Sequence, residues 1–155
     1  MNYIFSAIFL YFFLGFLLYI FQRRIIFNKS GHPGAPRDYN LDKTEEIFIK
    51  TEDNLDLLSW YHKGDDSLPL LVYFHGNSFH IGDRAYRMQK YIENNWSILL
   101  VSWRGFGGNK GKPTEKNFYK DSKAVLKWIE NNTKFQFKDL VIYGESLGSG
   151  VAVEL

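Results

Sequence analysis

The sequence contains no cysteine, which excludes disulfides, thiolate metal ligands and a cysteine nucleophile. This absence does not fix the compartment, because many secreted proteins also lack cysteine. A strong excess of one charge is absent too. The formal net charge is +2, which argues against a nucleic-acid partner. We therefore interpret the lysines at 110, 112 and 116 as a solvated loop face, and the sequence indicates no metal site and no cofactor.

The chain does have one long uncharged segment, from residue 3 to residue 21, which ends at Gln22-Arg23-Arg24. As a helix these 19 residues would span about 28 Å, close to the roughly 30 Å of a bilayer core. We predict a transmembrane anchor over residues 1–24, with 3–21 in contact with the lipid bilayer. A cleavable signal peptide is disfavoured, because no basic region precedes the segment and no small-residue cleavage site follows it.

Positive charge follows the anchor, at Arg23, Arg24 and Lys29. Taken literally, the positive-inside rule leaves the rest of the chain on the cytoplasmic side, although one helix and three charges leave the side of the membrane open. The next stretch, residues 25–42, is rich in turn-forming residues and is predicted to be a linker.

The remaining residues, 43–155, form a domain in which strands and helices alternate. Two runs around Asn54 indicate an antiparallel hairpin, with Asn54 at a position that favours positive φ. His62, in the second run, is interpreted as a strand-surface residue. Continuous apolar runs indicate buried parallel strands, and helical patterns separate them, so the fold class is α/β. The predicted strands are 45–51, 55–62, 68–74, 97–103 and 140–143, and the predicted helices are 83–94 and 115–131.

The last strand leads into residues 144–148, Gly-Glu-Ser-Leu-Gly, and small and apolar residues suited to a buried helix follow. This order of strand, G-x-S-x-G and helix is typical of a nucleophile elbow, in which Ser146 stands on a strained turn. Strand and helix can close around that turn only if the residues two before and two after it are tiny. Gly144 and Gly148 meet this demand.

Several motifs occur in a recognisable order: His-Gly-Asn at 75–77, Trp-Arg-Gly-Phe-Gly at 103–107, Gly-Lys-Pro-Thr-Glu at 111–115, and the pentapeptide. From about residue 25 to the end, the chain resembles the N-terminal half of the α/β-hydrolase fold. More narrowly, it resembles the Bem46-like membrane-anchored serine hydrolases. The resemblance implies a hairpin and parallel strands with flanking helices, in the strand order 1-2-4-3-5-6-7-8.

The resemblance also implies roles for individual residues. Ser146 would be the nucleophile that attacks an ester, thioester or amide. The backbone N–H of Leu147 would be one oxyanion-hole donor, and Asn77 or Ser78 would supply the other. His75 is interpreted as a residue that shapes this loop rather than as a base.

Two features depart from the family pattern. Relatives usually carry Asp where Ser102 stands, which puts a local ion pair of Arg104 in doubt. The catalytic triad of this fold runs Ser, then Asp or Glu, then His, and residues 147–155 supply neither partner. We therefore expect residues 1–155 alone to be nearly inactive, with the elbow strand at an open sheet edge.

Two hypotheses follow for the function. The chain is either the nucleophile-bearing piece of a membrane-anchored serine hydrolase, completed by a second chain, or an inactive truncated remnant that serves at most as a membrane-bound interaction protein.

Overall fold

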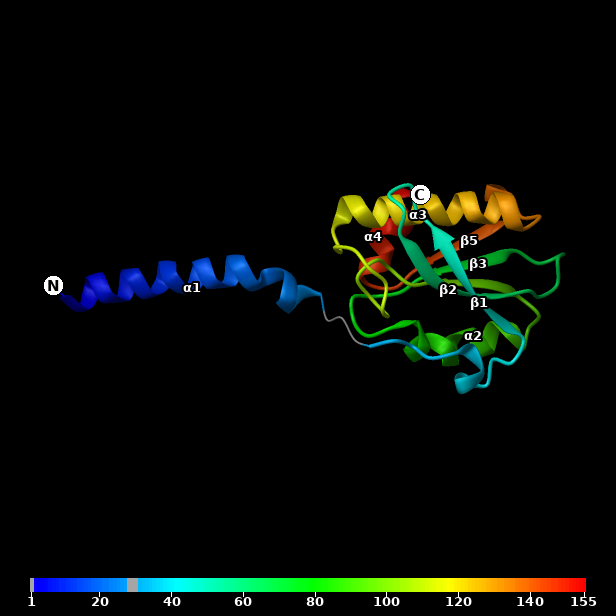
Figure 1. Cartoon of the computed structure of the whole chain (residues 1–155), viewed down its shortest axis with the longest axis horizontal. Coiled ribbons are helices and arrows are strands. Elements are labelled where there is room, and N and C mark those ends of the chain that lie inside the picture. Colours follow the sequence, from blue (N-terminus) through cyan, green and yellow to red (C-terminus); the bar gives the residue numbers. More distant parts are fainter. Residues whose placement is uncertain (1, 28–30) are drawn as a thin grey trace.

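The computed structural model describes residues 2–27 and 31–155. It consists of an apolar helix, α1, that projects away from an α/β domain (Figure 1). The helices are α1 (Asn2–Ile26), α2 (Ala85–Ile92), α3 (Glu115–Asn132) and α4 (Leu147–Glu154), with 3-10 helices η1 (Pro36–Tyr39), η2 (Ile81–Arg84) and η3 (Phe137–Asp139). The strands are β1 (Thr44–Lys50), β2 (Asp56–His62), β3 (Leu70–Phe74), β4 (Ser97–Val101) and β5 (Leu140–Gly144).

Helix α1 is long and apolar enough to cross a membrane. The candidate span, Tyr3–Ile26, has 24 residues and none of its most apolar part is buried against the domain. At 1.5 Å per residue it is about 36 Å long, which exceeds the bilayer core. The helix runs two residues beyond the predicted end of the anchor at residue 24.

The predicted linker differs in part from what the structure shows. Its residues 28–30 lie outside the described residues. Further along, the chain packs onto the domain: Leu41 is buried, and the ring of Tyr39 lies 5.4 Å from that of Trp60. The segment from η1 onward is therefore part of the domain surface, because its apolar side chains have core partners.

The sheet has the strand order β1-β2-β4-β3-β5, which confirms the order expected for the first five strands. β1 and β2 form the predicted antiparallel hairpin, and Asn54 in its turn has φ 61°. β4 pairs with β3 in parallel, and so does β5. Within the described residues β5 pairs only with β3, so it forms the edge of the sheet as expected.

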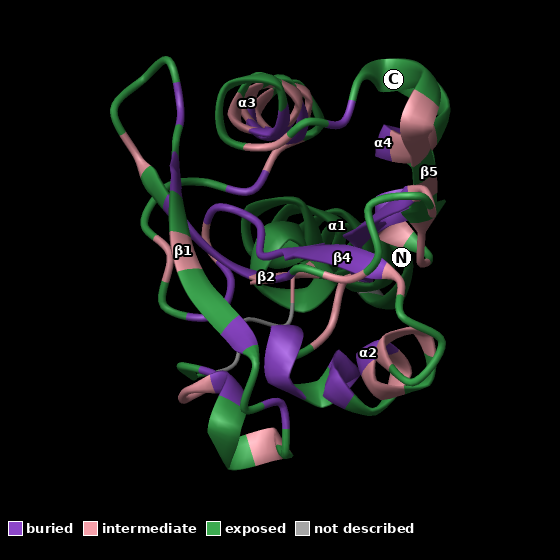
Figure 2. Ribbon diagram, turned by 90° about the vertical axis from the view of Figure 1, so that its right-hand side faces the viewer, coloured by how far each residue is buried: buried purple, intermediate pink, exposed green. Residues whose placement is uncertain are grey.

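Helices cover both faces of this sheet, with α3 and α4 on one side and α2 on the other (Figure 2). Helix α3 is capped by Thr114, whose hydroxyl accepts a hydrogen bond from the N–H of Asn117 at 3.2 Å. Phe118, Val125 and Ile129 share the face that α3 buries, because they are spaced close to whole helical turns.

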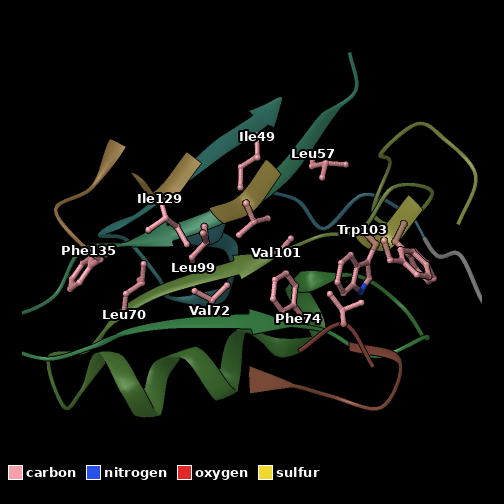
Figure 3. Close-up of a cluster of buried hydrophobic side chains, with 14 residues drawn as sticks. Ile49, Leu57, Leu70, Val72, Phe74, Leu99, Val101, Trp103, Ile129 and Phe135 are labelled. Atoms are coloured by element: carbon pink, nitrogen blue, oxygen red, sulfur yellow. The ribbon is translucent and has the colours of Figure 1, made fainter. Parts of the chain in front are cut away.

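The larger of the two buried clusters lies between the sheet and α3 (Figure 3). Its members around the carboxyl ends of β3 and β4 include Phe74 and Trp103, whose rings stack with centroids 5.0 Å apart. The second cluster lies under α2. Buried clusters on both faces of the sheet thus hold the ends of β3 and β4 in place, and they limit movement at the base of the loops that follow.

Two expectations about polar residues are wrong. His62 is only 7% exposed, because it lies on the same face of β2 as Leu58 and Trp60, which packs under α2. Arg104 does form ion pairs despite the serine at 102. It is 2% exposed and contacts Asp53 of the hairpin turn at 2.7 Å and Asp121 of α3 at 2.5 Å. Burial alone would lower the pKa of Arg104, but the two carboxylates outweigh it and raise that pKa.

Candidate active site

The turn between β5 and α4 has the backbone geometry of a nucleophile elbow. Ser146 has φ 49° and ψ −109°, and the helix begins at the next residue. A positive φ is uncommon for any residue other than glycine, and this conformation costs about 1–3 kcal/mol. The side chain is exposed, and its Oγ makes no hydrogen bond to any described residue. The turn therefore presents a free hydroxyl at the surface.

Both glycines of the pentapeptide are required by close backbone contacts. A Cβ added to Gly144 would lie 2.5 Å from the carbonyl oxygen of Gly148. A Cβ added to Gly148 would overlap the carbonyl oxygen of Phe74, at the end of the neighbouring strand. The steric demand that the sequence predicted at these two positions is present in the structure.

The loop after β3 lies directly beside this turn. The N–H of Glu145 donates to the carbonyl of Phe74 at 2.9 Å, and a Cβ placed on Gly76 would come within 3.4 Å of the Cβ of Ser146. The parallel pairing of β3 with β5 causes this proximity, because the carboxyl ends of both strands meet at one edge. The structure thus brings the predicted oxyanion loop next to the predicted nucleophile.

The predicted oxyanion donors lie on the two segments that meet here, namely the turn at Ser146 and the loop after β3. The N–H of Leu147, at the first position of α4, has no acceptor among the described residues, as is usual for the first turn of a helix. Asn77 and Ser78 are both half-buried in the loop. The Asn77 side chain donates to the carbonyl of Ile26, at the end of α1, and its Oδ1 is buried without a partner among the described residues. Which of the two supplies the second donor stays a prediction.

His75 is fully buried at the start of the same loop. Its Nδ1 lies 2.7 Å from the carbonyl of Gly76, and its own carbonyl accepts a hydrogen bond from Trp103 Nε1 at 2.9 Å. Burial lowers the pKa of His75 to about 4, so the ring is neutral at pH 7. These contacts suit the predicted role of a residue that shapes the loop.

Sequence reasoning missed a charged network behind the turn. The carboxylate of Glu145 accepts hydrogen bonds from Tyr73 at 2.6 Å, from Arg84 at 3.1 Å and from Arg87 at 3.3 Å. Partial burial pushes the pKa of Glu145 up, but the hydrogen bonds from Tyr73 and Arg84 outweigh this and leave it lowered. The only local signal was an acidic residue inside the pentapeptide, whose partners lie 58 to 72 positions away in the chain.

No acidic or basic side chain in the described part of the chain hydrogen-bonds to the hydroxyl of Ser146. The nearest carboxylate in sequence, Glu145, is engaged by the arginines. The described residues likewise contain no cluster of three or more His, Asp or Glu side chains that could hold a metal ion. A surface hollow of about 670 Å³ lies between β1 and α3, and Ser146 does not line it.

Comparison with known proteins places this geometry in context. The chain is 31% identical over 148 residues to an uncharacterised protein of Mycobacterium tuberculosis, covering 91% of the chain and 52% of the relative. It is 29% identical over 152 residues to protein bem46 of Schizosaccharomyces pombe, covering 92% and 50%. It is 26% identical over 141 residues to the lysophosphatidylserine lipase ABHD12 of Danio rerio, covering 77% and 36%.

Among solved structures, the esterase Pf2001 of Pyrococcus furiosus superposes with a TM-score of 0.68 at 23% identity, covering 83% of this chain and 49% of the esterase. No protein-family model matches the chain. The chain thus spans about half the length of the first curated relatives it matches.

Proposed function

The chain is a Bem46-like protein with the N-terminal half of an α/β-hydrolase fold, and on this premise we propose that it carries the nucleophile and the oxyanion hole of a membrane-anchored serine hydrolase. The observation that carries the proposal is the strained backbone of Ser146, at φ 49°, between a strand and the first residue of a helix. A serine in an ordinary surface turn would adopt an unstrained backbone conformation, so the strain at Ser146 favours a functional role.

In the proposed reaction, Ser146 Oγ attacks the carbonyl carbon of an ester, thioester or amide. The hydroxyl proton passes to a base, and the carbonyl oxygen becomes an oxyanion. The N–H of Leu147 and an N–H of the loop at Asn77 or Ser78 stabilise that charge. When the tetrahedral species collapses, the alcohol, thiol or amine leaves with the proton and an acyl-enzyme remains, which water then hydrolyses by the same steps.

The base and its acidic partner come from outside residues 1–155 in this proposal. In this fold both follow the nucleophile along the chain, and they reside either on a continuation of this chain or on a second polypeptide. Loss of the histidine from a serine triad lowers kcat on the order of 10⁶-fold in the subtilisin case. Residues 1–155 by themselves should therefore turn an acyl substrate over very slowly.

The end of α1 supports an active site at the membrane surface. The carbonyl of Ile26 accepts a hydrogen bond from the Asn77 side chain, and the ring of Phe27 packs edge-on against Phe106 and Phe118, with centroids 6.3 and 6.0 Å away. If α1 spans the bilayer, these contacts hold the oxyanion loop next to the interface. An acyl substrate at the bilayer surface fits this arrangement.

Labelling with a fluorophosphonate probe tests the proposal in native membranes, where any continuing or partner polypeptide is present. The probe is expected to modify Ser146, and Ser146→Ala should abolish the signal. Ser67→Ala is the matched control, because Ser67 is an exposed serine before β3 whose hydroxyl donates to Asp65 and does not contact the elbow. An unlabelled wild-type protein would remove the hydrolase assignment and leave the interaction protein as the function.

A further inference from the structure

The proposed oxyanion hole depends on two segments that the sheet does not hold together. Leu147 belongs to the elbow, and the second donor belongs to the loop after β3. Phe74 and Gly144 are the last paired residues of β3 and β5, so the strand ladder ends before either segment begins. Oxyanion donors must lie about 2.7–3.1 Å from the developing charge, and a displacement of about 1 Å costs on the order of 10² in rate. The N–H of Glu145 holds the base of the loop through the carbonyl of Phe74, but residues 77 and 78 lie three and four positions further along. Another contact has to set their distance from the elbow.

The guanidinium of Arg84 bridges the two segments directly. Its Nη1 donates to the carbonyl of Ser78 in the loop at 2.8 Å. Its Nη2 and Nε donate to the two carboxylate oxygens of Glu145, at 3.1 and 3.3 Å. Glu145 is the residue immediately before Ser146. One planar group thus contacts both sides of the proposed site with three nitrogen atoms.

The surroundings of Arg84 make this bridge rigid. The residue is the last of η2 and is only 7% exposed, so its side chain is held by packing. The hydroxyl of Tyr73 donates to Oε2 of Glu145 at 2.6 Å, which fixes the carboxylate that Arg84 binds. Bonds between an arginine fork and a carboxylate are directional as well as strong, so the contact transmits position and not only charge.

We propose that Arg84 is a positioning residue that fixes the oxyanion loop relative to the nucleophile elbow. This inference rests on the proposed function for its effect on catalysis, although the bridge itself is a property of the fold. Lysine cannot replace arginine here, because a single ammonium does not reach Ser78 and both oxygens of Glu145 in one fixed plane.

Arg87 supplies a matched control. It also donates to Glu145, at 3.3 Å, and to the hydroxyl of Tyr73, at 2.8 Å. Among the described residues it makes no hydrogen bond to the oxyanion loop. Loss of Arg87 therefore weakens the same charged network without releasing Ser78, which separates a loss of stability from a loss of positioning.

Hydrogen exchange on the full chain in detergent micelles tests the bridge without any assay of activity. Arg84→Met is expected to raise exchange in residues 75–79 about tenfold or more, because the loop opens locally, whereas Arg87→Met leaves that segment unchanged. Arg84→Lys should behave like Arg84→Met and serves if the methionine variant fails to fold. Exchange at the wild-type level in both Arg84 variants, or an equal rise in Arg87→Met, would overturn the inference.

The rate of fluorophosphonate labelling at Ser146 in native membranes tests the consequence for catalysis. Arg84→Met should lower the maximal labelling rate about 100-fold while the concentration for half-maximal labelling stays within about twofold, because the reaction is affected rather than binding. Arg87→Met should stay within about twofold of the wild type in both values, because Tyr73 and Arg84 still hold Glu145. An unaltered maximal rate in Arg84→Met refutes the positioning role. Absence of labelling in the wild type itself would refute the hydrolase proposal instead, and hydrogen exchange would then decide the bridge alone.

Discussion

Replacing Ser146 by glycine and by alanine separates the backbone strain of the elbow from the chemistry of the hydroxyl. At φ 49° and ψ −109° the Cβ of any L-residue is crowded, whereas glycine adopts such a conformation readily. The strain amounts to about 1–3 kcal/mol for a residue other than glycine. Glycine in turn loses about 0.5–1 kcal/mol through its greater freedom in the unfolded chain. The difference predicts that Ser146→Gly is about 1 kcal/mol more stable than Ser146→Ala.

The free energy of unfolding of the full chain in detergent micelles measures this difference. A change of about 1 kcal/mol corresponds to roughly 4 °C in Tm for a domain of this size. Lys127, which is exposed on α3, provides the control for the intrinsic effect of glycine. There Lys127→Gly should be about 1 kcal/mol less stable than Lys127→Ala, so the sign is opposite to that at the elbow. If alanine is as stable as glycine at residue 146, the turn is not strained and the nucleophile assignment loses its basis.

Three further predictions concern the same domain. Gly148→Ala should destabilise the domain by about 3 kcal/mol or more, because the added Cβ would overlap the carbonyl of Phe74. Gly150→Ala, whose added Cβ meets nothing within 4 Å, should instead stabilise α4 by up to about 1 kcal/mol. Equal denaturation midpoints for the two variants would contradict the packing at the elbow. The pKa of His75 is lowered to about 4 from an ordinary 6.5, so as the pH falls the unfolded state takes up this proton before the folded state does. Stability should therefore be complete above about pH 6.5 and decline by about 3 kcal/mol as the pH falls to about 4, and unfolding curves across this window that show no change would refute the burial of a neutral ring. Asp121→Ala should cost about 3–5 kcal/mol of stability, because it removes a fully buried carboxylate from the buried guanidinium of Arg104. Asp53→Ala should cost about 1 kcal/mol, because the Asp53 side chain is 37% exposed. Chemical denaturation that shows the reverse order would exclude a central role for the pair of Arg104 and Asp121.

The order of elements was predictable because each element is encoded locally. A continuous apolar run is enough to indicate a buried strand, and the structure has β3 and β4 within the runs at 68–74 and 97–103. The ends of strands were predicted less accurately. β4 stops at Val101, two residues before the end of the apolar run, because the chain leaves the sheet there and packs Trp103 against Phe74 and Phe118.

The candidate site was predictable in part for the same reason. The roles of Gly144, Gly148 and Asn54 could be predicted, because they depend on steric limits among a few neighbouring residues, which can be judged from the sequence alone. The arrangement of loop and elbow followed from the resemblance, since it depends on which parallel strands are neighbours.

The amino-acid sequence by itself determined the apolar helix α1, the alternation of strands and helices, and the strained serine turn, because these depend on periodicity and on local steric limits. Only the tertiary structure decided that Arg84 bridges Ser78 and Glu145, and that Arg104 is buried between two carboxylates. Such pairs join residues up to 61 positions apart. Their partners are selected by strand register and helix packing, which no local pattern in the chain specifies.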